Sequence, residues 1–152
     1  MSTLRIGIVG APSTGKTTLA EGISFHYKSQ GSLKRVALIS EYARGFVNDF
    51  KIPTTADQKH ILDKQIENEI MANGATIMVT DSPFWLSYVY ACHVCNSSPM
   101  PKDNYYLNQI HSSIVNRLHD YDLLIYLPFN EAFCEKVKIS DGQRVHDDSK
   151  TI

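Results

Sequence analysis

The sequence predicts an α/β fold in which helices cover both faces of a mostly parallel sheet. Short and nearly continuous apolar runs recur along the chain, as they do in strands that are buried on both faces. Between them lie segments whose apolar residues are three or four positions apart, the spacing of amphipathic helices. The alternation of these two patterns over 152 residues indicates one domain with three layers.

Four apolar runs are the candidate strands, and they cover residues 4–9, 34–40, 75–80 and 122–127. Three of the runs lead directly into a residue that can carry chemistry, namely Gly10, Glu41 and Asp81. Ligands of open parallel sheets bind at the carboxyl ends of the strands. We therefore expect these three strand ends to share one crevice.

The first two helices are expected over residues 16–29 and from Glu41 to about Phe50. A third is expected from Thr55 to about Ala72. In this helix Thr55 and Gln58 fit a capping box, and the expected buried stripe consists of Leu62, Ile66 and Ile70.

The last two helices have their own start signals. Ser82 is the expected N-cap and Pro83 the first residue of a helix that runs toward Cys95. Asp103 is expected to cap the final helix, whose apolar stripe consists of Leu107, Ile110, Ile114 and Leu118.

Residues 10–17 read G-A-P-S-T-G-K-T and match the phosphate-loop pattern G-x-x-x-x-G-K-[ST]. In such a loop the glycines let successive backbone N–H groups point into one concavity, and the following helix adds its own unpaired N–H groups. Lys16 would contact the β and γ phosphates, while the Thr17 hydroxyl would coordinate Mg²⁺. The predicted ATP-binding residues are Gly10, Ser13, Thr14, Gly15, Lys16, Thr17 and Thr18.

Two acidic residues could complete the site. Asp81 follows an apolar strand, as the magnesium-binding acid of such proteins does, so Thr17 and Asp81 are the predicted metal ligands. The alternative role of Asp81 is to help cap the next helix. Glu41 could bind an acceptor hydroxyl and act as its general base, or be an ordinary acid in the first turn of a helix. Either Asp81 or Glu41 could serve as the base.

Arg44, three residues after Glu41, could clamp a phosphate or pair with that glutamate. Tyr42 and Trp85 could stack on the ring of a substrate, or belong to the core. Arg144 lies in the polar and turn-rich segment near the C-terminus. It could close over the γ-phosphate as part of a lid, or be a surface arginine.

Composition restricts the partners. The 15 Lys and Arg residues against 16 Asp and Glu give a net charge of −1, so no overall basic field favours nucleic acid or an anionic membrane. No apolar run is long enough to cross a bilayer, and the N-terminus lacks the pattern of a secretory signal. The expected location is the cytoplasm, and the expected partner is a small molecule.

The motifs together resemble the small P-loop kinases similar to the ribosylnicotinamide kinase domain of bacterial NAD-regulator proteins. The resemblance rests on G-A-P-S-T-G-K-T-T-L, S-E-Y-A-R-G-F-V, V-T-D-S-P-F, Y-D-L-L-I-Y-L and D-G-Q-R, which follow one another in this order. It implies a three-layer P-loop NTPase fold with strand order 2-3-1-4-5, a substrate near Glu41, Arg44 and Asp81, and a lid arginine at Arg144. Such domains usually continue past the lid to a fifth strand, whereas this chain stops at Ile152. Either the chain is truncated or the fifth strand is absent, so the expected order here is 2-3-1-4.

The resulting expectation is an ATP- and Mg²⁺-dependent kinase that phosphorylates a hydroxyl of a small nucleoside-like substrate, and the resemblance suggests nicotinamide riboside. The expected catalytic residues are Lys16, Asp81, Glu41 and Arg144, and the expected substrate-binding residues are Glu41, Tyr42, Arg44, Asp81 and Trp85.

Two other functions stay open. A nucleoside or deoxynucleoside monophosphate kinase would need a second phosphate clamp, for which Arg44, Arg117 and Lys138 are available. The other is a non-catalytic nucleotide-binding module. The sequence argues against a GTPase-like switch, because the D-x-x-G motif would need glycine where Phe84 stands and no N-K-x-D follows the fourth strand.

Overall fold

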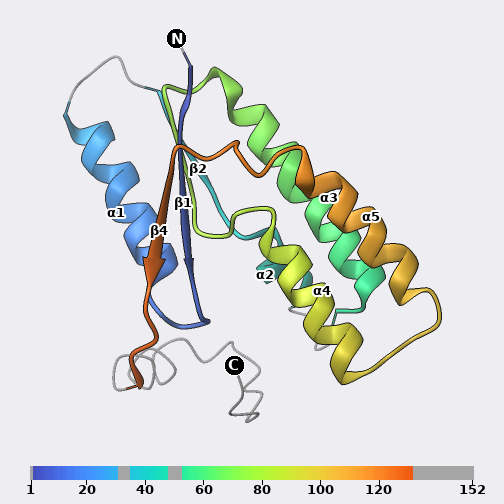
Figure 1. Cartoon of the computed structure of the whole chain (residues 1–152). Helices are drawn as coiled ribbons and strands as arrows, with labels where there is room; N and C mark the ends of the chain where they lie inside the picture. The colour runs from blue at the N-terminus through green and yellow to red at the C-terminus, as the bar shows by residue number, and fades with distance from the viewer. Residues whose placement is uncertain (1, 31–34, 48–52, 132–152) are drawn as a thin grey trace.

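A four-stranded parallel sheet forms the centre of the computed structural model, which describes residues 2–30, 35–47 and 53–131, with only the backbone at 46 and 47. The strands are β1 (Leu4–Gly10), β2 (Val36–Ile39), β3 (Ile77–Thr80) and β4 (Leu123–Leu127) (Figure 1). Their order is β2-β3-β1-β4, which confirms the predicted order. The register places Leu38, Val79, Ile6 and Leu123 in one row, so that β1, β2 and β3 end at the same edge.

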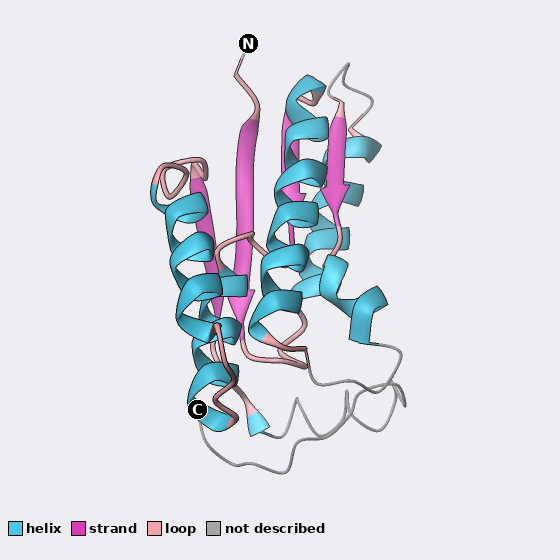
Figure 2. Ribbon diagram, turned by 90° about the vertical axis from the view of Figure 1, so that its right-hand side faces the viewer, coloured by secondary structure: helices cyan, strands magenta, loops and turns pink. Residues whose placement is uncertain are grey.

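Helices lie on both faces of this sheet, as predicted (Figures 1 and 2). One face is covered by α1 (Lys16–Ser29), and the other by α3 (Thr55–Met71), α4 (Leu86–Ser97) and α5 (Asp103–Val115). The short α2 (Tyr42–Val47) follows β2, and the 3-10 turn η1 (Ala72–Gly74) follows α3. In the described part of the chain, no helix combines the length and apolar character that a membrane span needs.

Each face of the sheet has its own hydrophobic core. The core under α1 consists of Ile6, Ile8, Ala20, Ile77 and Val79, and the core under the three longer helices consists of Leu62, Phe84, Ala91, Ile110 and Ile114. Burying a side chain as large as Leu or Phe contributes about 1.5–3 kcal/mol. The first core therefore holds α1 against the strands, and the second joins α3 to α4 and α5.

The start of α3 differs from the prediction by one residue. Thr54 is the N-cap: its hydroxyl accepts the backbone N–H of Asp57 over 3.2 Å, and the Asp57 carboxylate accepts the N–H of Thr54 over 2.8 Å. The predicted Thr55–Gln58 box is wrong because both side chains are buried. The Thr55 hydroxyl instead donates to Asp103 over 2.5 Å.

The start of α4 differs more. The helix begins at Leu86, after a turn in which the N–H of Leu86 donates to the carbonyl of Pro83 over 3.0 Å. A Ser82 cap would use the N–H of Phe84, but this group donates to the Tyr121 hydroxyl over 3.1 Å as the Phe84 ring enters the core. The predicted Ser82 cap and Pro83 start are therefore wrong.

Asp103 is the first residue of α5 and does not cap it. Its carboxylate accepts hydrogen bonds from the Thr55 hydroxyl and from the backbone N–H of Met100, so it joins α5 to α3.

Two residues of the predicted apolar stripes are exposed. Ile70 points outward because α3 buries the neighbouring Glu69, and Leu118 lies beyond the end of α5.

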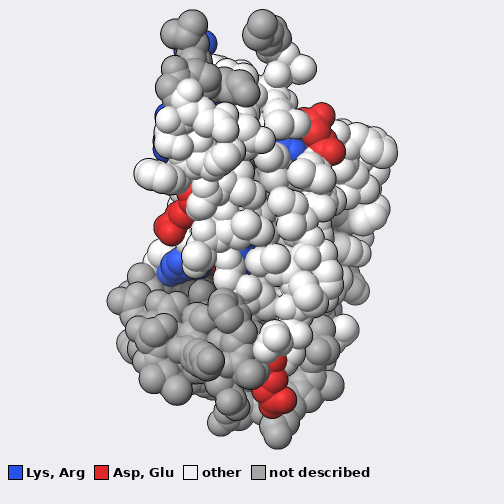
Figure 3. Space-filling model, turned by 90° about the vertical axis from the view of Figure 1, so that its left-hand side faces the viewer, with Lys and Arg blue, Asp and Glu red and all other residues white. Residues whose placement is uncertain are grey.

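The edge strand β4 is less covered than the strands beside it. Leu123 and Leu124 are half exposed and Tyr126 is 69% exposed, whereas every residue of β3 is buried. Figure 3, which views the molecule from the left-hand side of Figure 1, shows few charged side chains among the described residues on that side. The expectation of strands covered on both faces therefore holds for β3 and not for β4.

Candidate active site

The loop of residues 10–15 joins β1 to α1 at the carboxyl edge of the sheet. Ser13 and Gly15 have positive φ angles of 64° and 89°, and this left-handed backbone is unstrained at glycine. Gly15 is the N-cap of α1 and makes no capping hydrogen bond through a side chain. No side chain of the N-cap therefore occupies the first N–H groups of α1, which the motif predicts to bind an anion.

Two side chains of the loop fold back onto its own carbonyl groups. The Lys16 ammonium donates to the carbonyls of Gly10 and Ala11, each over 2.9 Å, and the Thr14 hydroxyl donates to Ala11 over 2.8 Å. Ser13 is buried in the loop, whereas the Thr18 side chain is exposed on the first turn of α1. The positive charge of Lys16 is thus held at the loop, beside the N-terminus of α1.

The residues predicted to bind the metal are in direct contact. The Thr17 hydroxyl donates to Oδ2 of Asp81 over 2.5 Å, and Asp81 is only 2% exposed. Its other oxygen, Oδ1, is buried and has no hydrogen-bond partner among the described residues. A hydroxyl and a carboxylate with an unused oxygen are ligands that Mg²⁺ prefers, so these two residues fit the ion.

Arg44 connects this pair to the end of β2. Its Nη2 donates to the Thr17 hydroxyl over 2.9 Å and lies 3.7 Å from Oε2 of Glu41. The pairing with Glu41 that was considered for Arg44 is therefore present, and the same guanidinium also reaches Thr17 at the start of α1. Its role as a phosphate clamp stays a prediction. The four side chains of Glu41, Arg44, Thr17 and Asp81 therefore form one continuous chain of polar contacts at the carboxyl edge of the sheet.

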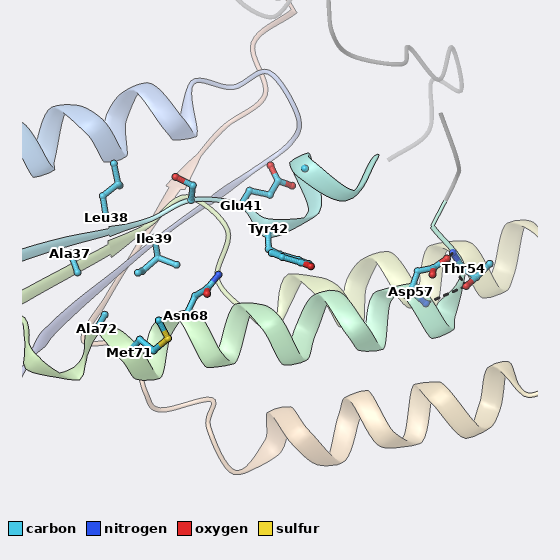
Figure 4. Close-up of a pocket in the computed structure, with 12 residues that line it drawn as sticks. Ala37, Leu38, Ile39, Glu41, Tyr42, Thr54, Asp57, Asn68, Met71 and Ala72 are labelled. Atoms are coloured by element: carbon cyan, nitrogen blue, oxygen red, sulfur yellow. Dashed lines mark hydrogen bonds between the residues drawn. The ribbon is translucent and has the colours of Figure 1, made fainter. Parts of the chain in front are cut away.

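A groove with a volume of about 1200 Å³ begins at Glu41 and extends between β2 and α3. Tyr42 lines it (Figure 4). The Tyr42 ring lies edge-on to His60, with 5.9 Å between the ring centres. Gln65 of α3 holds α2 in place, because its amide accepts the N–H of Tyr42 and donates to the Thr80 hydroxyl, each over 3.3 Å.

The other predicted site residues are not part of the chain of contacts that the described residues form from Glu41 to Asp81. Trp85 is half buried and packs against the core of the helical layer. Arg117 pairs with Asp120 over 3.1 Å, and its guanidinium lies 5.7 Å from the centre of the Phe84 ring. Arg144 and Lys138 lie outside the described residues.

Sequence reasoning did not find the wall that α3 contributes to the groove. Asp57, Asn68 and Met71 line it, and none of the three was singled out. Apart from the expected capping box, only the apolar residues of α3 were considered, although its buried face also carries Gln58, Gln65 and Glu69. These polar residues at helical spacing were the available signal that α3 borders something other than a plain apolar core.

Comparison with known proteins places these features in a wider group. The model of the AAA_28 family, described as an AAA domain, matches residues 5–151. No functionally curated protein matches the sequence.

Two solved structures have a similar fold. A structure of deoxyadenosine kinase from M. mycoides with the products dCMP and a flexible dCDP bound has a TM-score of 0.68 and 14% identity, and the match covers 98% of this chain and 75% of that one. A second structure of that kinase, with bound dATP, has a TM-score of 0.65 and 16% identity, and the match covers 91% of this chain and 72% of that one. The similarity establishes the α/β P-loop fold with its sheet order.

Proposed function

Because this chain belongs to the AAA_28 family of AAA domains, we propose that it is an ATP- and Mg²⁺-dependent kinase that phosphorylates a hydroxyl group of a small nucleoside-like acceptor. The observation that carries the proposal is the chain of contacts from Glu41 through Arg44 and Thr17 to Asp81. It links a phosphate loop to the mouth of a groove that can admit a second molecule. The fold shared with deoxyadenosine kinase supports the same class of reaction.

The loop side of the site would hold the nucleotide. The N–H groups at the start of α1 and the Lys16 ammonium would bind the β and γ phosphates. Thr17 and Asp81 would hold Mg²⁺, which when bound neutralises the charge that develops on the phosphates during transfer. This assigns Asp81 to the metal and leaves Glu41, which follows β2, for the acceptor.

Glu41 would then be the general base. Its carboxylate would accept the proton of the acceptor hydroxyl while the hydroxyl oxygen forms a bond to the γ-phosphorus. The bond between that phosphorus and the β–γ bridging oxygen breaks, and ADP leaves. Arg44 would keep Glu41 oriented beside the loop, and Arg144 is proposed as the cation that closes over the transferred group.

Nicotinamide riboside is the acceptor that we propose first, on the resemblance of the motifs. A nucleoside monophosphate is the second candidate. Of the three cations considered for a second phosphate clamp, Arg44 is the one that the described residues place beside the loop, and it is already engaged by Glu41 and Thr17. This observation favours an acceptor without a phosphate.

A screen of ATP consumption tests the proposal. The protein would be supplied with ATP and Mg²⁺ together with nicotinamide riboside, ribonucleosides, deoxynucleosides or their monophosphates, and ADP and phosphorylated product would be measured. We expect transfer to at least one nucleoside, and loss of this transfer in Lys16→Ala and without Mg²⁺. Binding of nucleotide without transfer to any acceptor would overturn the proposal and favour a non-catalytic nucleotide-binding module.

A further inference from the structure

The groove between β2 and α3 differs in chemistry along its length. Its inner part is apolar and is walled by Ala37 and Ile39 of β2 and by Met71 of α3. Its outer part carries the two carboxylates of Glu41 and Asp57. Figure 4 shows the groove from the side, with the strand β2 above and α3 below.

We propose that this groove is the subsite for the ring of the acceptor and that the Asn68 amide binds this ring by hydrogen bonds. We further propose that the charge of the groove favours a positively charged ring over a neutral one and disfavours a phosphorylated acceptor. The proposal rests on the kinase function proposed above, and it adds the residues and the charge that select the acceptor.

The geometry gives the direction in which the acceptor would lie. Glu41 stands where the groove opens toward the phosphate loop, because its partner Arg44 reaches Thr17. An acceptor whose hydroxyl lies at Glu41 would extend its ring along the groove, toward Ile39 and Met71. Flat rings bind between such apolar walls, and a few polar groups then fix their orientation.

Asn68 is the polar group at the right place. Its side chain projects from α3 toward the end of β2, into the space between Ile39 and Tyr42 (Figure 4). It is half buried, and it makes no hydrogen bond to another described residue. Its amide offers both N–H donors and a carbonyl acceptor, so it can pair with a carboxamide or with the edge of a nucleobase.

The charge of the groove points to the same class of acceptor. Glu41 and Asp57 line it, and the described lining includes no Lys, Arg or His. Arg44 stands at the mouth, where its guanidinium faces Thr17 and Glu41. A concave surface that carries one sign of charge concentrates ligands of the opposite sign. A cationic ring inside the groove is therefore attracted, whereas a phosphate group that lies inside the groove, beyond Arg44, meets carboxylates and no cation of the described lining.

A series of substitutions at Asn68 tests the proposal by direct binding. The variants Asn68→Asp, Asn68→Leu and Asn68→Lys would be titrated calorimetrically with nicotinamide riboside as the cationic ligand, adenosine as the neutral ligand and AMP as the phosphorylated ligand. The same changes at Asn108, which is exposed on α5, are the matched controls. Thermal unfolding of each variant reports whether the fold is intact.

We expect the wild-type protein to bind the cationic ligand most tightly and AMP least. Asn68→Leu should weaken both nucleosides by about 5-fold, the effect of one lost hydrogen bond. Asn68→Asp should strengthen binding of the cationic ligand, and Asn68→Lys should weaken it and strengthen binding of AMP. The Asn108 variants should leave all three affinities unchanged.

Three results would count against the proposal. Equal binding of AMP and adenosine by the wild-type protein would contradict the charge argument. If every Asn68 variant binds the nucleosides with the wild-type affinity and still phosphorylates them, the groove is not the subsite for the ring. The proposed kinase function would then stand. No binding or phosphorylation of any nucleoside would overturn this inference and the proposed function together.

Discussion

The Thr17 hydroxyl donates a hydrogen bond of 2.5 Å to Oδ2 of Asp81, although the two residues are 64 positions apart in the chain. The first lies at the start of α1 and the second directly after β3. Because β1 and β3 are paired in parallel, both residues reach the same edge of the sheet.

Removing the Thr17 hydroxyl should weaken the binding of Mg²⁺ and leave the fold intact. Thr17→Ala deletes the oxygen that would coordinate the ion, whereas Thr17→Ser keeps it. Loss of a group that holds or orients a metal ligand costs on the order of 10- to 100-fold in metal affinity. We expect a loss of this size for Thr17→Ala in the Mg²⁺ dependence of ATP binding, measured by calorimetry. Equal Mg²⁺ dependence in Thr17→Ala and Thr17→Ser would contradict the assignment.

Removing Arg44 should strengthen the binding of a divalent cation in the absence of nucleotide. The Arg44 guanidinium donates over 2.9 Å to the oxygen that would bind the ion. An ion about 2.1 Å from this oxygen would lie within about 5 Å of the guanidinium nitrogen, so the two positive charges oppose each other.

The competition between Arg44 and a divalent cation can be measured with Mn²⁺, whose binding is detected through its electron paramagnetic resonance signal. We expect Arg44→Ala to bind Mn²⁺ several-fold more tightly than the wild-type protein. Lys64→Ala is the control, because Lys64 is an exposed cation of α3 that pairs with Glu67. Unchanged or weaker Mn²⁺ binding by Arg44→Ala would show that the arginine does not compete with the ion.

Gly10→Ala should damage the phosphate loop. A Cβ atom at Gly10 would lie 2.6 Å from the carbonyl oxygen of Leu127 and 2.9 Å from the Thr14 hydroxyl, so the backbone of β4 or of the loop must move. Overpacking of this kind destabilises by about 1–3 kcal/mol. We expect this loss in denaturant unfolding, together with weaker nucleotide binding.

Gly22→Ala is the matched control for this change. A Cβ atom at Gly22, inside α1, would contact nothing within 4 Å. Replacing glycine by alanine inside a helix stabilises by about 1 kcal/mol. If the two variants unfold alike, the close approach at Gly10 does not matter for stability.

Glu69→Gln should remove a pH dependence of stability. Glu69 is fully buried at the end of α3, where Tyr121 donates to its two oxygens over 2.8 and 2.9 Å. Burial raises the pKa of Glu69 from 4.5 to about 7, and the hydrogen bond from Tyr121 and the charge of Arg5 oppose this shift.

The sign of the effect follows from proton binding. Between pH 4.5 and about 7 the folded protein keeps the proton of Glu69 and the unfolded chain releases it, so the free energy of unfolding falls as the pH rises. A shift of this size corresponds to a loss of about 3 kcal/mol. Urea unfolding at pH 4.5 to 8 should show this loss in the wild-type protein and a smaller one in Glu69→Gln. Glu67→Gln, an exposed neighbour, should behave like the wild type, and parallel curves for all three proteins would contradict the assignment.

Local patterns in the sequence predicted the sheet and one half of the site. The apolar runs identified all four strands, and the motif of residues 10–17 identified the loop that the structure forms. Glu41 and Asp81 could be predicted because each lies within two residues of the end of a strand, and the ends of parallel strands meet. These features depend on neighbours in the chain, which is why a sequence is sufficient to find them.

The starts of α3 and α4 depend on contacts between residues that are far apart in the sequence. The Thr55 hydroxyl donates to Asp103, and the backbone N–H of Phe84 donates to the Tyr121 hydroxyl. The caps that were predicted from neighbouring residues at the starts of α3 and α4 therefore do not form. No local pattern contains these partners, because they are brought together only by the packing of the helical layer.

The sequence by itself determined that the chain is an α/β protein with a phosphate loop, because strand periodicity and the backbone of a glycine-rich turn are local properties. Only the tertiary structure decided what lies opposite that loop. Arg44 bridges Glu41 to Thr17, and Asn68 faces the groove beside β2, because α2 and α3 pack against the end of the sheet. The proposed phosphate-binding half of the site is therefore encoded in one continuous segment, and the proposed acceptor half depends on segments that only folding brings together.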